Sequence, residues 1–371
     1  MRALFASLGE REQDKALRYF IEDAVQKRPY LDSLCFANLL PRAIQYELYF
    51  NEHNRKYPEY AKEDWDCFFD DLLDPDNQSR PKIQEILERN RNNTTIIERY
   101  LGPKLVLKKV YPNRGIYIAD FGCSLALGVR ELELGNGICE VEDKTEDKIT
   151  ERLSKVRLNI VGGVATDREY LEDKVDWVAA CSVYFNDIDR LGFLLARHAF
   201  TKRNSGIDFH QADMLDLNLV AEPNNQHARD RYQIKKGAYD ASMVLTALYQ
   251  LPDDDVFKAL TNLRKATKPG GVVIVQDFFG LEEKSLRNRD IPSIPLESLG
   301  IEDRRSIVRY QDFYAGEPYR TLVLRLDKDQ RFNRAWEVLR WNHARCESLS
   351  AGSDYAIFME ENSRNRLRKA S

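Results

Sequence analysis

The sequence lacks the features that mark a disulfide-bonded, membrane-spanning or metal-binding protein. Its six cysteines include no C-x-x-C pair and are scattered along 371 residues, which is typical of reduced, mostly buried thiols in an intracellular protein. Its five histidines show no metal-ligand spacing, so no metal is predicted. The start of the chain has too short an apolar run for a secretory signal, and no apolar run reaches spanning length. We therefore expect a soluble, cytoplasmic protein with no membrane segment.

An excess of charge of one sign is also missing. Charged residues make up 31% of the chain, but they nearly cancel to a net charge of −4. A nucleic-acid binder normally carries a basic excess, so a nucleic-acid partner is not expected. Hydrophobic residues make up 43% of the chain, enough for a packed core, and the length exceeds what one core usually organises. We expect two structural units, or one domain with large additions.

Three glycine-based motifs are absent as well. The chain has no G-x-G-x-x-G, which a nicotinamide dinucleotide site would use to bring the backbone against a pyrophosphate. It has no G-x-x-x-x-G-K-[ST], so a P-loop is excluded. It has no G-x-S-x-G, the turn that presents the nucleophile of a serine hydrolase.

Residues 1–103 are predicted to form an all-helical unit. Apolar residues recur at helical spacing from about residue 10 to 102, and prolines at 29, 41, 58 and 81 separate the segments. The aromatic residues of these segments are expected to pack in a core rather than to line a ligand site. A helical unit in this place commonly covers the mouth of the following domain or mediates dimerisation. A homodimer through these helices is therefore one expectation.

From residue 104 onward, strand and helix patterns alternate. Nearly continuous apolar strands between amphipathic helices are typical of a parallel sheet covered on both faces. We expect an α/β domain over residues 104–371, with a doubly wound, mostly parallel, seven-stranded Rossmann-like sheet and a charged insertion near 136–174. The predicted strands are Ile116–Asp120, Trp177–Asp187, Ile207–Asp213, Tyr239–Leu245, Val272–Asp277, Arg320–Leu326 and Tyr355–Met359, and the predicted helices are Leu127–Leu134, Arg190–Lys202, Asp254–Ala266 and Phe332–Cys346.

The first three of the predicted strands each end in an acid, at Asp120, Asp187 and Asp213. In a doubly wound sheet, ligands bind beyond the carboxyl ends of the strands. An acid after the second strand can accept both hydroxyls of a ribose, and an acid after the third can receive an adenine amine. Neither role requires a phosphate. Each acid could instead cap a helix or lie on the surface.

The order of these features resembles the class I S-adenosylmethionine-dependent methyltransferase family. Asp120–Ala126 resembles its first motif, D-x-G-x-G-x-G, with Ser124 and Ala126 where glycines are usual. Asn186–Asp189 is similar to the second motif, and Gln211–Met214 to the third. Residues 239–251 and 263–277, with Pro-Gly-Gly before a strand, resemble the end of the family's core. The resemblance covers roughly residues 111–280 and identifies no subfamily.

This resemblance implies S-adenosyl-L-methionine as the cofactor and assigns roles along its length. The methionine part would lie beside the first turn, the ribose on the second acid, the adenine on the residues after it and on the third motif, and the sulfonium near the end of the fourth strand. The implied cofactor-binding residues are Asp120, Gly122, Cys123, Ser124, Ala126, Asp187, Ile188, Asp213, Met214, Leu245 and Thr246.

The catalytic residues and the acceptor are less defined by the sequence. Tyr249, His210 and Asp277 lie near the expected strand ends, where each could instead satisfy backbone hydrogen bonds. The acidic balance favours methyl transfer to O, N or C of a small organic acceptor. Two alternatives stay open: methyl transfer to protein or RNA, and a catalytically silent module that assembles with a partner, which the serine and alanine in the first turn would suit.

Overall fold

The computed structural model describes most of the chain, in segments. They are residues 23, 26–27, 33–47, 70–71, 74, 76–89, 94–135, 156–169, 174–182, 188–220, 233–248, 251, 253–277, 319–341 and 350–370. The chain divides into two compact units. The first comprises Met1–Thr94 and Lys174–Leu195, and the second comprises Thr95–Asp173 and Ala196–Ser371.

The first unit contains helices α3 (Ser33–Tyr46), α5 (Ser79–Arg89) and α9 (Val175–Ser182). The amide of Gln45 at the end of α3 donates to the Ala180 carbonyl in α9 at 3.2 Å. The rings of Tyr46 and Trp177 meet edge to face, with centroids 5.5 Å apart. Helix α10 (Ile188–Asn204) begins in this unit and ends in the second.

Helix α9 corrects a prediction, because Trp177–Asp187 was expected to be a strand. The described part of that segment is helical as far as Ser182. A short apolar run without alternation is compatible with a buried strand and with a buried helix turn. The paired alanines of this run favour the helix, since alanine has the highest helix propensity.

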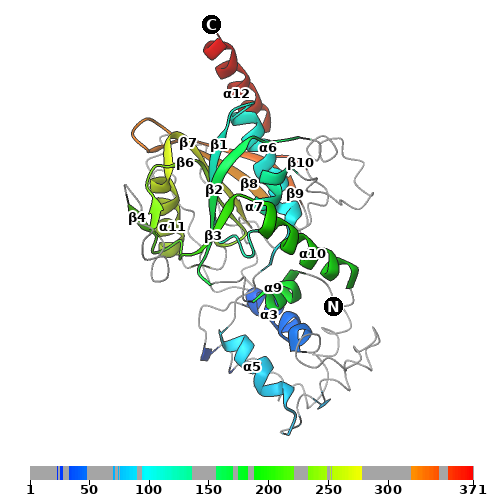
Figure 1. Ribbon diagram of the computed structural model, residues 1–371. Coiled ribbons are helices and arrows are strands. Elements are labelled where there is room, and N and C mark those ends of the chain that lie inside the picture. The colour runs from blue at the N-terminus through cyan, green and yellow to red at the C-terminus, as the bar shows by residue number, and fades with distance from the viewer. Residues whose placement is uncertain are drawn as a thin grey trace. The chain divides into compact units, whose positions relative to one another are not determined.

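The second unit is built on an eight-stranded sheet of order β10-β9-β8-β7-β6-β1-β2-β3 (Figure 1). Strands β3, β2, β1, β6 and β7 run parallel, whereas β8, β9 and β10 pair with their neighbours in antiparallel fashion. A separate parallel pair is formed by β4 and β5. The strands are β1 (Ile116–Phe121), β2 (Ile160–Asp167), β3 (Ile207–Gln211), β4 (Asn218–Val220), β5 (Gln233–Lys235), β6 (Tyr239–Leu245), β7 (Thr267–Asp277), β8 (Tyr319–Leu326), β9 (Phe332–Trp341) and β10 (Ser350–Ala351).

Helices cover both faces of this sheet (Figure 1). Helix α11 (Asp253–Ala266) packs on β6 and β7, and its apolar side joins one core with Phe121, Val244 and Val273. On the other face, α7 (Leu127–Leu134) packs on β2 and β3, while α6 (Leu101–Val110) packs on β8 and on the short 3-10 helix η2 (Ile97–Tyr100). The predicted Rossmann-like α/β fold is therefore present, in a mixed sheet.

The strand order contains a topological switch point. From β1 the chain moves outward through β2 and β3, and it then returns to the other side of β1 as β6 and continues to β7. Between β1 and β6 the winding therefore reverses, and in open α/β sheets this reversal opens a crevice at the carboxyl ends of the strands.

Strand β2 was missed by the sequence interpretation, which placed residues 136–174 in a charged insertion. Its residues, Ile160–Asp167, include two adjacent glycines, which are poor strand formers by propensity. The structure explains Gly163, because a Cβ there would lie 2.3 Å from the Ile118 carbonyl oxygen of β1. The backbones of the two strands approach closely at this point, and tertiary packing therefore overrides the local signal.

The C-terminal predictions were also reversed. Residues 332–341 form strand β9 rather than a helix, and Tyr355–Ala370 forms helix α12 rather than a strand. Strand β9 pairs along its length with β8, which supplies the hydrogen bonds. In α12, buried Phe358 and Asn362 are four residues apart, as one helix face requires, and the ring of Phe358 packs on Trp336 at 5.5 Å.

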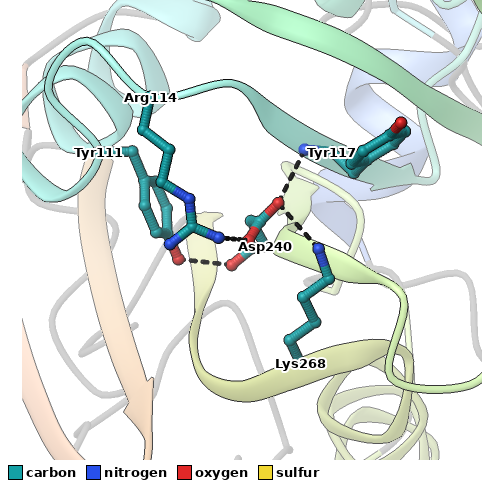
Figure 2. A network of polar contacts seen from close by, with 5 residues as sticks. All are labelled: Tyr111, Arg114, Tyr117, Asp240 and Lys268. Carbon is teal, nitrogen blue, oxygen red and sulfur yellow. Dashed lines mark hydrogen bonds and ion pairs between the residues drawn. The ribbon is translucent and has the colours of Figure 1, made fainter.

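At the amino ends of β1 and β6, the side chain of Asp240 holds several elements together (Figure 2). It accepts hydrogen bonds from Arg114 at 2.5 Å, from the Tyr117 backbone N–H at 2.9 Å and from Lys268 at 3.1 Å. The Tyr111 hydroxyl donates to the Asp240 carbonyl at 2.6 Å. The carboxylate is 4% exposed, so these donors take the place of water around it.

Among the described residues, no helix has the length and apolar character needed to cross a bilayer. The same part of the chain contains no group of three or more His, Cys, Asp or Glu side chains that could hold a metal ion.

The Asp240 network yields a stability prediction. Asp240→Asn should lower the free energy of unfolding by about 1–3 kcal/mol, because the amide cannot accept two charge-assisted hydrogen bonds and leaves Arg114 and Lys268 without their shared anion. The two cations are partly exposed, so the loss should stay below that of a fully buried pair. Urea unfolding measures it, with the exposed Asp329→Asn as the matched control. Equal stability of both variants would contradict a stabilising role.

Candidate functional site

The candidate site lies at the carboxyl ends of β1, β2, β3 and β6, around the switch point. The turn after β1 is its centre. The backbone N–H groups of Gly122 and Cys123 both donate to the Thr166 carbonyl of β2, at 2.8 and 3.1 Å. These bonds fix the turn against the neighbouring strand before α7 begins.

Three residues of this turn have left-handed backbone conformations. The φ angles are +72° at Gly122, +56° at Ser124 and +56° at Ala126. Ser124 and Ala126 stand where the resemblance expects glycines, and the structure shows that the chain keeps a glycine-like backbone at both. For residues with a Cβ this conformation costs roughly 1–2 kcal/mol each. Strain of this kind is typical of functional turns.

Asp120, at the end of β1, is completely buried. Its Oδ2 accepts a hydrogen bond from the Tyr100 hydroxyl of η2 at 2.5 Å. A Cβ at Gly128 would overlap the Tyr100 ring at 2.0 Å, so this glycine makes room for the tyrosine. Burial raises the pKa of Asp120 to about 7, the Tyr100 hydrogen bond opposes this rise, and the charge of Asp167 adds to it.

Asp167, at the end of β2, is the second buried carboxyl of the site. Its Oδ2 accepts the Ser124 backbone N–H at 3.0 Å, which joins the β1 turn to the end of β2. Burial raises its pKa to about 6, and the backbone N–H groups that it accepts limit the rise.

The acid at the end of the second strand is therefore Asp167, not Asp187 as the sequence interpretation had it. Asp187 lies outside the described residues, and the segment before it is helical. Ile188, expected beside it, is the first residue of α10 and belongs to the first unit. The error follows directly from the missed strand β2.

Three buried polar atoms of this region have no hydrogen-bond partner in the part of the chain that the structure describes. They are Asp120 Oδ1, Ser124 Oγ and Thr166 Oγ1. Buried polar atoms are rarely left unpaired in folded proteins, and those that are left call for an explanation. All three belong to the ends of β1 and β2 or to the turn between β1 and α7, which is where a ligand would supply partners.

The third acid, Asp213, follows β3 in a tight turn. Its Oδ1 accepts the Leu215 N–H at 2.9 Å, and its Oδ2 lies 3.5 Å from the Arg168 Nε. The next residue, Met214, is held through its carbonyl, which accepts from the Asn262 amide of α11 at 2.9 Å. A Cβ at Gly122 would lie 2.9 Å from the Met214 methyl group, so the β1 and β3 turns are neighbours.

At the end of β6, Leu245 and Thr246 are both buried. Thr246 has a φ of +54°, and its N–H donates to the Gln276 carbonyl of β7 at 2.6 Å. Its hydroxyl donates to the Leu245 carbonyl at 2.7 Å and accepts from the Arg99 guanidinium of η2. The structure thus brings together the first-turn residues, Asp213, Met214, Leu245 and Thr246, and adds Tyr100, Arg99 and Asp167.

The three catalytic candidates have different placements. Tyr249 lies outside the described residues. Asp277 is buried at the end of β7, where its Oδ2 accepts the Leu248 N–H at 2.8 Å, so it supports the turn after β6. His210 is on β3, and burial lowers its pKa, while the charge of Asp208 opposes that shift. From the sequence, each candidate has an alternative role, which is to accept or donate backbone hydrogen bonds. The contact of Asp277 with the Leu248 N–H is of that kind.

Arg99 and Tyr100 were missed because they lie in a segment predicted to be part of the helical leader. The structure assigns Thr95–Asp173, which includes both residues, to the second unit. A signal was present in the sequence, since Gly102-Pro103 lies two residues after Tyr100 and marks a break in a helical pattern. The strand ends that these side chains reach are set by tertiary packing, which no local sequence pattern encodes.

The strained turn yields a prediction. Ala126→Gly should keep or raise stability by up to about 1 kcal/mol, because relief of the left-handed strain offsets the extra chain entropy of glycine. Ala119→Gly in β1, equally buried but extended, should cost about 1 kcal/mol or more. Thermal unfolding of both variants measures the contrast. A larger loss for Ala126→Gly than for Ala119→Gly would refute the strain.

The raised pKa of Asp120 yields a pH prediction. Between pH 4 and 7 the folded state retains a proton that the unfolded state releases, so this group makes stability fall as pH rises through that window. Asp120→Asn removes the effect. Relative to wild type, the variant should therefore gain on the order of 2 kcal/mol in unfolding free energy between pH 5 and pH 8.

Urea unfolding at the two pH values measures this gain. Asp329→Asn, which replaces an exposed carboxyl, should show a constant difference from wild type. A constant difference for Asp120→Asn would mean that its pKa is not raised.

Comparison with known proteins gives only distant likenesses. No family model matches the sequence, and no curated protein matches it. A chain of the complex between the Haloferax volcanii Trm112 methyltransferase activator and a methyltransferase is 14% identical, with a TM-score of 0.28, over 50% of this chain and 54% of that one. An S-adenosylmethionine dependent methyltransferase from Mesorhizobium loti is 15% identical, with a TM-score of 0.27, over 49% of this chain and 54% of that one. The YcgJ protein from Bacillus subtilis is 13% identical, with a TM-score of 0.30, over 57% of this chain and 62% of that one. The chain thus spans about half the length of the first of these structures.

Proposed function

We propose that the chain binds S-adenosylmethionine at the switch point and transfers its methyl group to a small organic acceptor. One observation carries the proposal: two buried carboxyls, Asp120 and Asp167, flank the strained turn after β1. The motif resemblance supports the same conclusion from the sequence.

The charge of the site discriminates between ligand classes. Two carboxyls beside the turn would repel a phosphate, which is the group that this position binds in dinucleotide folds. They attract cations and accept hydrogen bonds from hydroxyls. A nucleoside that carries a sulfonium and an ammonium group, and no phosphate, therefore fits the observed charges.

The residues present fit this ligand. Asp167 would take the role first given to Asp187 and accept hydrogen bonds from the ribose hydroxyls. Asp213 and Met214 would bind the adenine edge, and Oδ1 of Asp120, which has no partner among the described residues, would accept the ammonium group. The hydroxyls of Ser124 and Thr166, which also lack partners within the described part of the chain, lie in the same region and would gain partners when the site is filled.

When bound, S-adenosylmethionine supplies a methyl group activated by its sulfonium. The chain contributes orientation and exclusion of water, which are the main requirements of an in-line displacement. Asp120, Ser124 and Thr246 are each at most 7% exposed, so polar groups that fix the ligand are shielded from solvent. Leu245 and Thr246, at the end of β6, would border the reacting centre.

The small organic acceptor and a homodimer through the helices of the first unit are further parts of the proposal. The net charge of −4, with 56 basic and 60 acidic residues, supports a small acceptor over a nucleic acid. Sedimentation of the purified chain tests the dimer. Incorporation of label from methyl-labelled S-adenosylmethionine into small-molecule extracts, compared with protein and RNA fractions, tests the acceptor class.

Calorimetric titration with S-adenosylmethionine is the test of the site. Asp167→Asn should weaken binding by roughly ten- to a hundredfold, because hydrogen bonds to a charged acceptor contribute about 1.5–3 kcal/mol. Asp329→Asn makes the same charge change at an exposed position of the β8–β9 connection and should bind as wild type does.

Two outcomes would contradict the proposal. Absence of binding by the folded wild-type chain removes the cofactor. Equal affinity of wild type and Asp167→Asn removes the assignment of Asp167. Release of S-adenosylhomocysteine in the presence of an acceptor extract distinguishes an enzyme from a silent binding module.

A further inference from the structure

A row of basic side chains lies at the amino ends of β1, β2, β6 and β7, the opposite end of these strands from the candidate site. Lys108, in the last turn of α6, donates to the Arg157 carbonyl ahead of β2 at 3.4 Å. Arg114, in the turn before β1, and Lys268, at the start of β7, hold Asp240 from two sides (Figure 2). We call these four cations, Lys108, Arg157, Arg114 and Lys268, the basic row.

The basic row is open to solvent and only partly neutralised. Arg157 is exposed, and no described residue forms a hydrogen bond or ion pair with its guanidinium. The side chains of Arg114 and Lys268 are 56% and 35% exposed, whereas the carboxylate that they share, on Asp240, is 4% exposed. An arginine carries five N–H donors and a lysine three, so one buried acid cannot use them all. The row therefore keeps donors and positive charge for a partner.

An aromatic ring stands beside the basic row. Tyr117, near the start of β1, is 48% exposed, and the Lys268 Nζ lies 5.3 Å from the centroid of its ring. A Cβ at Gly162 of β2 would lie 3.2 Å from this ring, so the ring lies close to the β2 backbone. The tyrosine is thus held in place while much of its surface stays open to solvent.

Helix α12 continues the basic character at this end of the sheet. Lys109 of α6 donates to the Ser363 hydroxyl at 2.8 Å, so the two helices are neighbours. From residue 363 to residue 370, the sequence of α12 has no acid and four basic residues, Arg364, Arg366, Arg368 and Lys369. Beyond Lys268, the β8–β9 connection adds no net charge, because its acids and bases balance (Asp327, Asp329, Lys328 and Arg331).

Cations in a row beside an open aromatic ring match the chemistry of a single-stranded nucleic acid. Lysine and arginine bind its phosphates, and its unpaired bases stack on aromatic side chains. A duplex keeps its bases inside and would leave the ring unused. An acidic protein segment could pair with the cations but offers no base to the ring. The net charge of −4 is a sum over the whole chain, whereas clustering on one face is what such binding requires.

We propose that the basic row and Tyr117 form a docking surface for a single-stranded nucleic acid. Its phosphates bind the four cations, and one of its bases stacks on the Tyr117 ring. This surface goes beyond the proposed function, because it lies at the opposite end of the strands from the cofactor site. Methyl transfer to a small acceptor does not depend on it.

Fluorescence anisotropy with a labelled oligouridylate of about 12 nucleotides measures the docking. Wild type should bind with a Kd of about 1–100 µM at low salt, and the affinity should fall as salt rises. Arg157→Gln and Lys108→Gln should each weaken binding and reduce the slope of log affinity against log salt by about 0.7, the value for one phosphate contact. Lys258→Gln removes an exposed lysine of α11 and, as the matched control, should keep the wild-type affinity and slope.

Substitution of the ring separates stacking from charge. Tyr117→Leu should weaken binding by about five- to a hundredfold with no change in the salt slope, because stacking releases no counterions. Tyr117→Phe keeps the ring and should bind as wild type does. Arg114 and Lys268 are left unchanged in these variants because they also hold Asp240.

Three results would overturn the proposal. They are no binding by folded wild type at low salt, equal affinity of wild type and Arg157→Gln, and equal affinity for a labelled polyglutamate of the same charge, which would assign the row to an acidic protein. Asp167→Asn should bind the oligouridylate as wild type does. A failure of this docking surface is therefore distinct from a failure of the cofactor site.

Discussion

Burial of Asp120 at the end of β1 is the constraint on which the rest of the site depends. A carboxyl removed from water needs donors, and Tyr100 supplies one at 2.5 Å. That contact requires η2 to lie against α7, and Gly128 makes the approach possible. Once η2 is placed in this way, the residue before Tyr100 reaches β6. A single buried acid thus explains why a segment outside the strand-helix alternation belongs to the site.

The turn after β1 shows how the chain meets a backbone requirement without glycine. Ser124 and Ala126 adopt left-handed conformations at the two positions where the motif that this turn resembles has glycines, and the Ser124 N–H donates to Asp167. The side chains of Ser124 and Ala126 therefore do not close the turn. Their left-handed backbones store local strain, and the contacts of β1 with β2 hold that strain in place.

Sequence reasoning predicted the parts of the fold that are coded locally. The apolar strands β1, β6 and β7 and the amphipathic helices α7, α10 and α11 lie where their periodicity indicated. Strand β2 could not be found in this way, because Gly163 is there for the approach of the Ile118 carbonyl, a contact between distant segments. The site prediction depended on the same assignment, since it took Asp187 as the acid at the end of the second strand, where the structure has Asp167. Arg99 was also missed, because its place beside Thr246 depends on packing between segments that are distant in the sequence.

The amino and carboxyl ends of the parallel strands carry the same residue type, aspartate, in opposite roles. Asp240, at the amino end of β6, is enclosed by Arg114, Lys268 and a backbone N–H, so its acceptors are used within the protein. Asp120, at the carboxyl end of the neighbouring strand, keeps one oxygen without a partner among the described residues. A fully paired carboxylate stabilises the fold and offers nothing to a ligand. A half-paired one costs stability unless a ligand supplies a donor, and this difference is why we place the candidate site at the carboxyl ends of the strands.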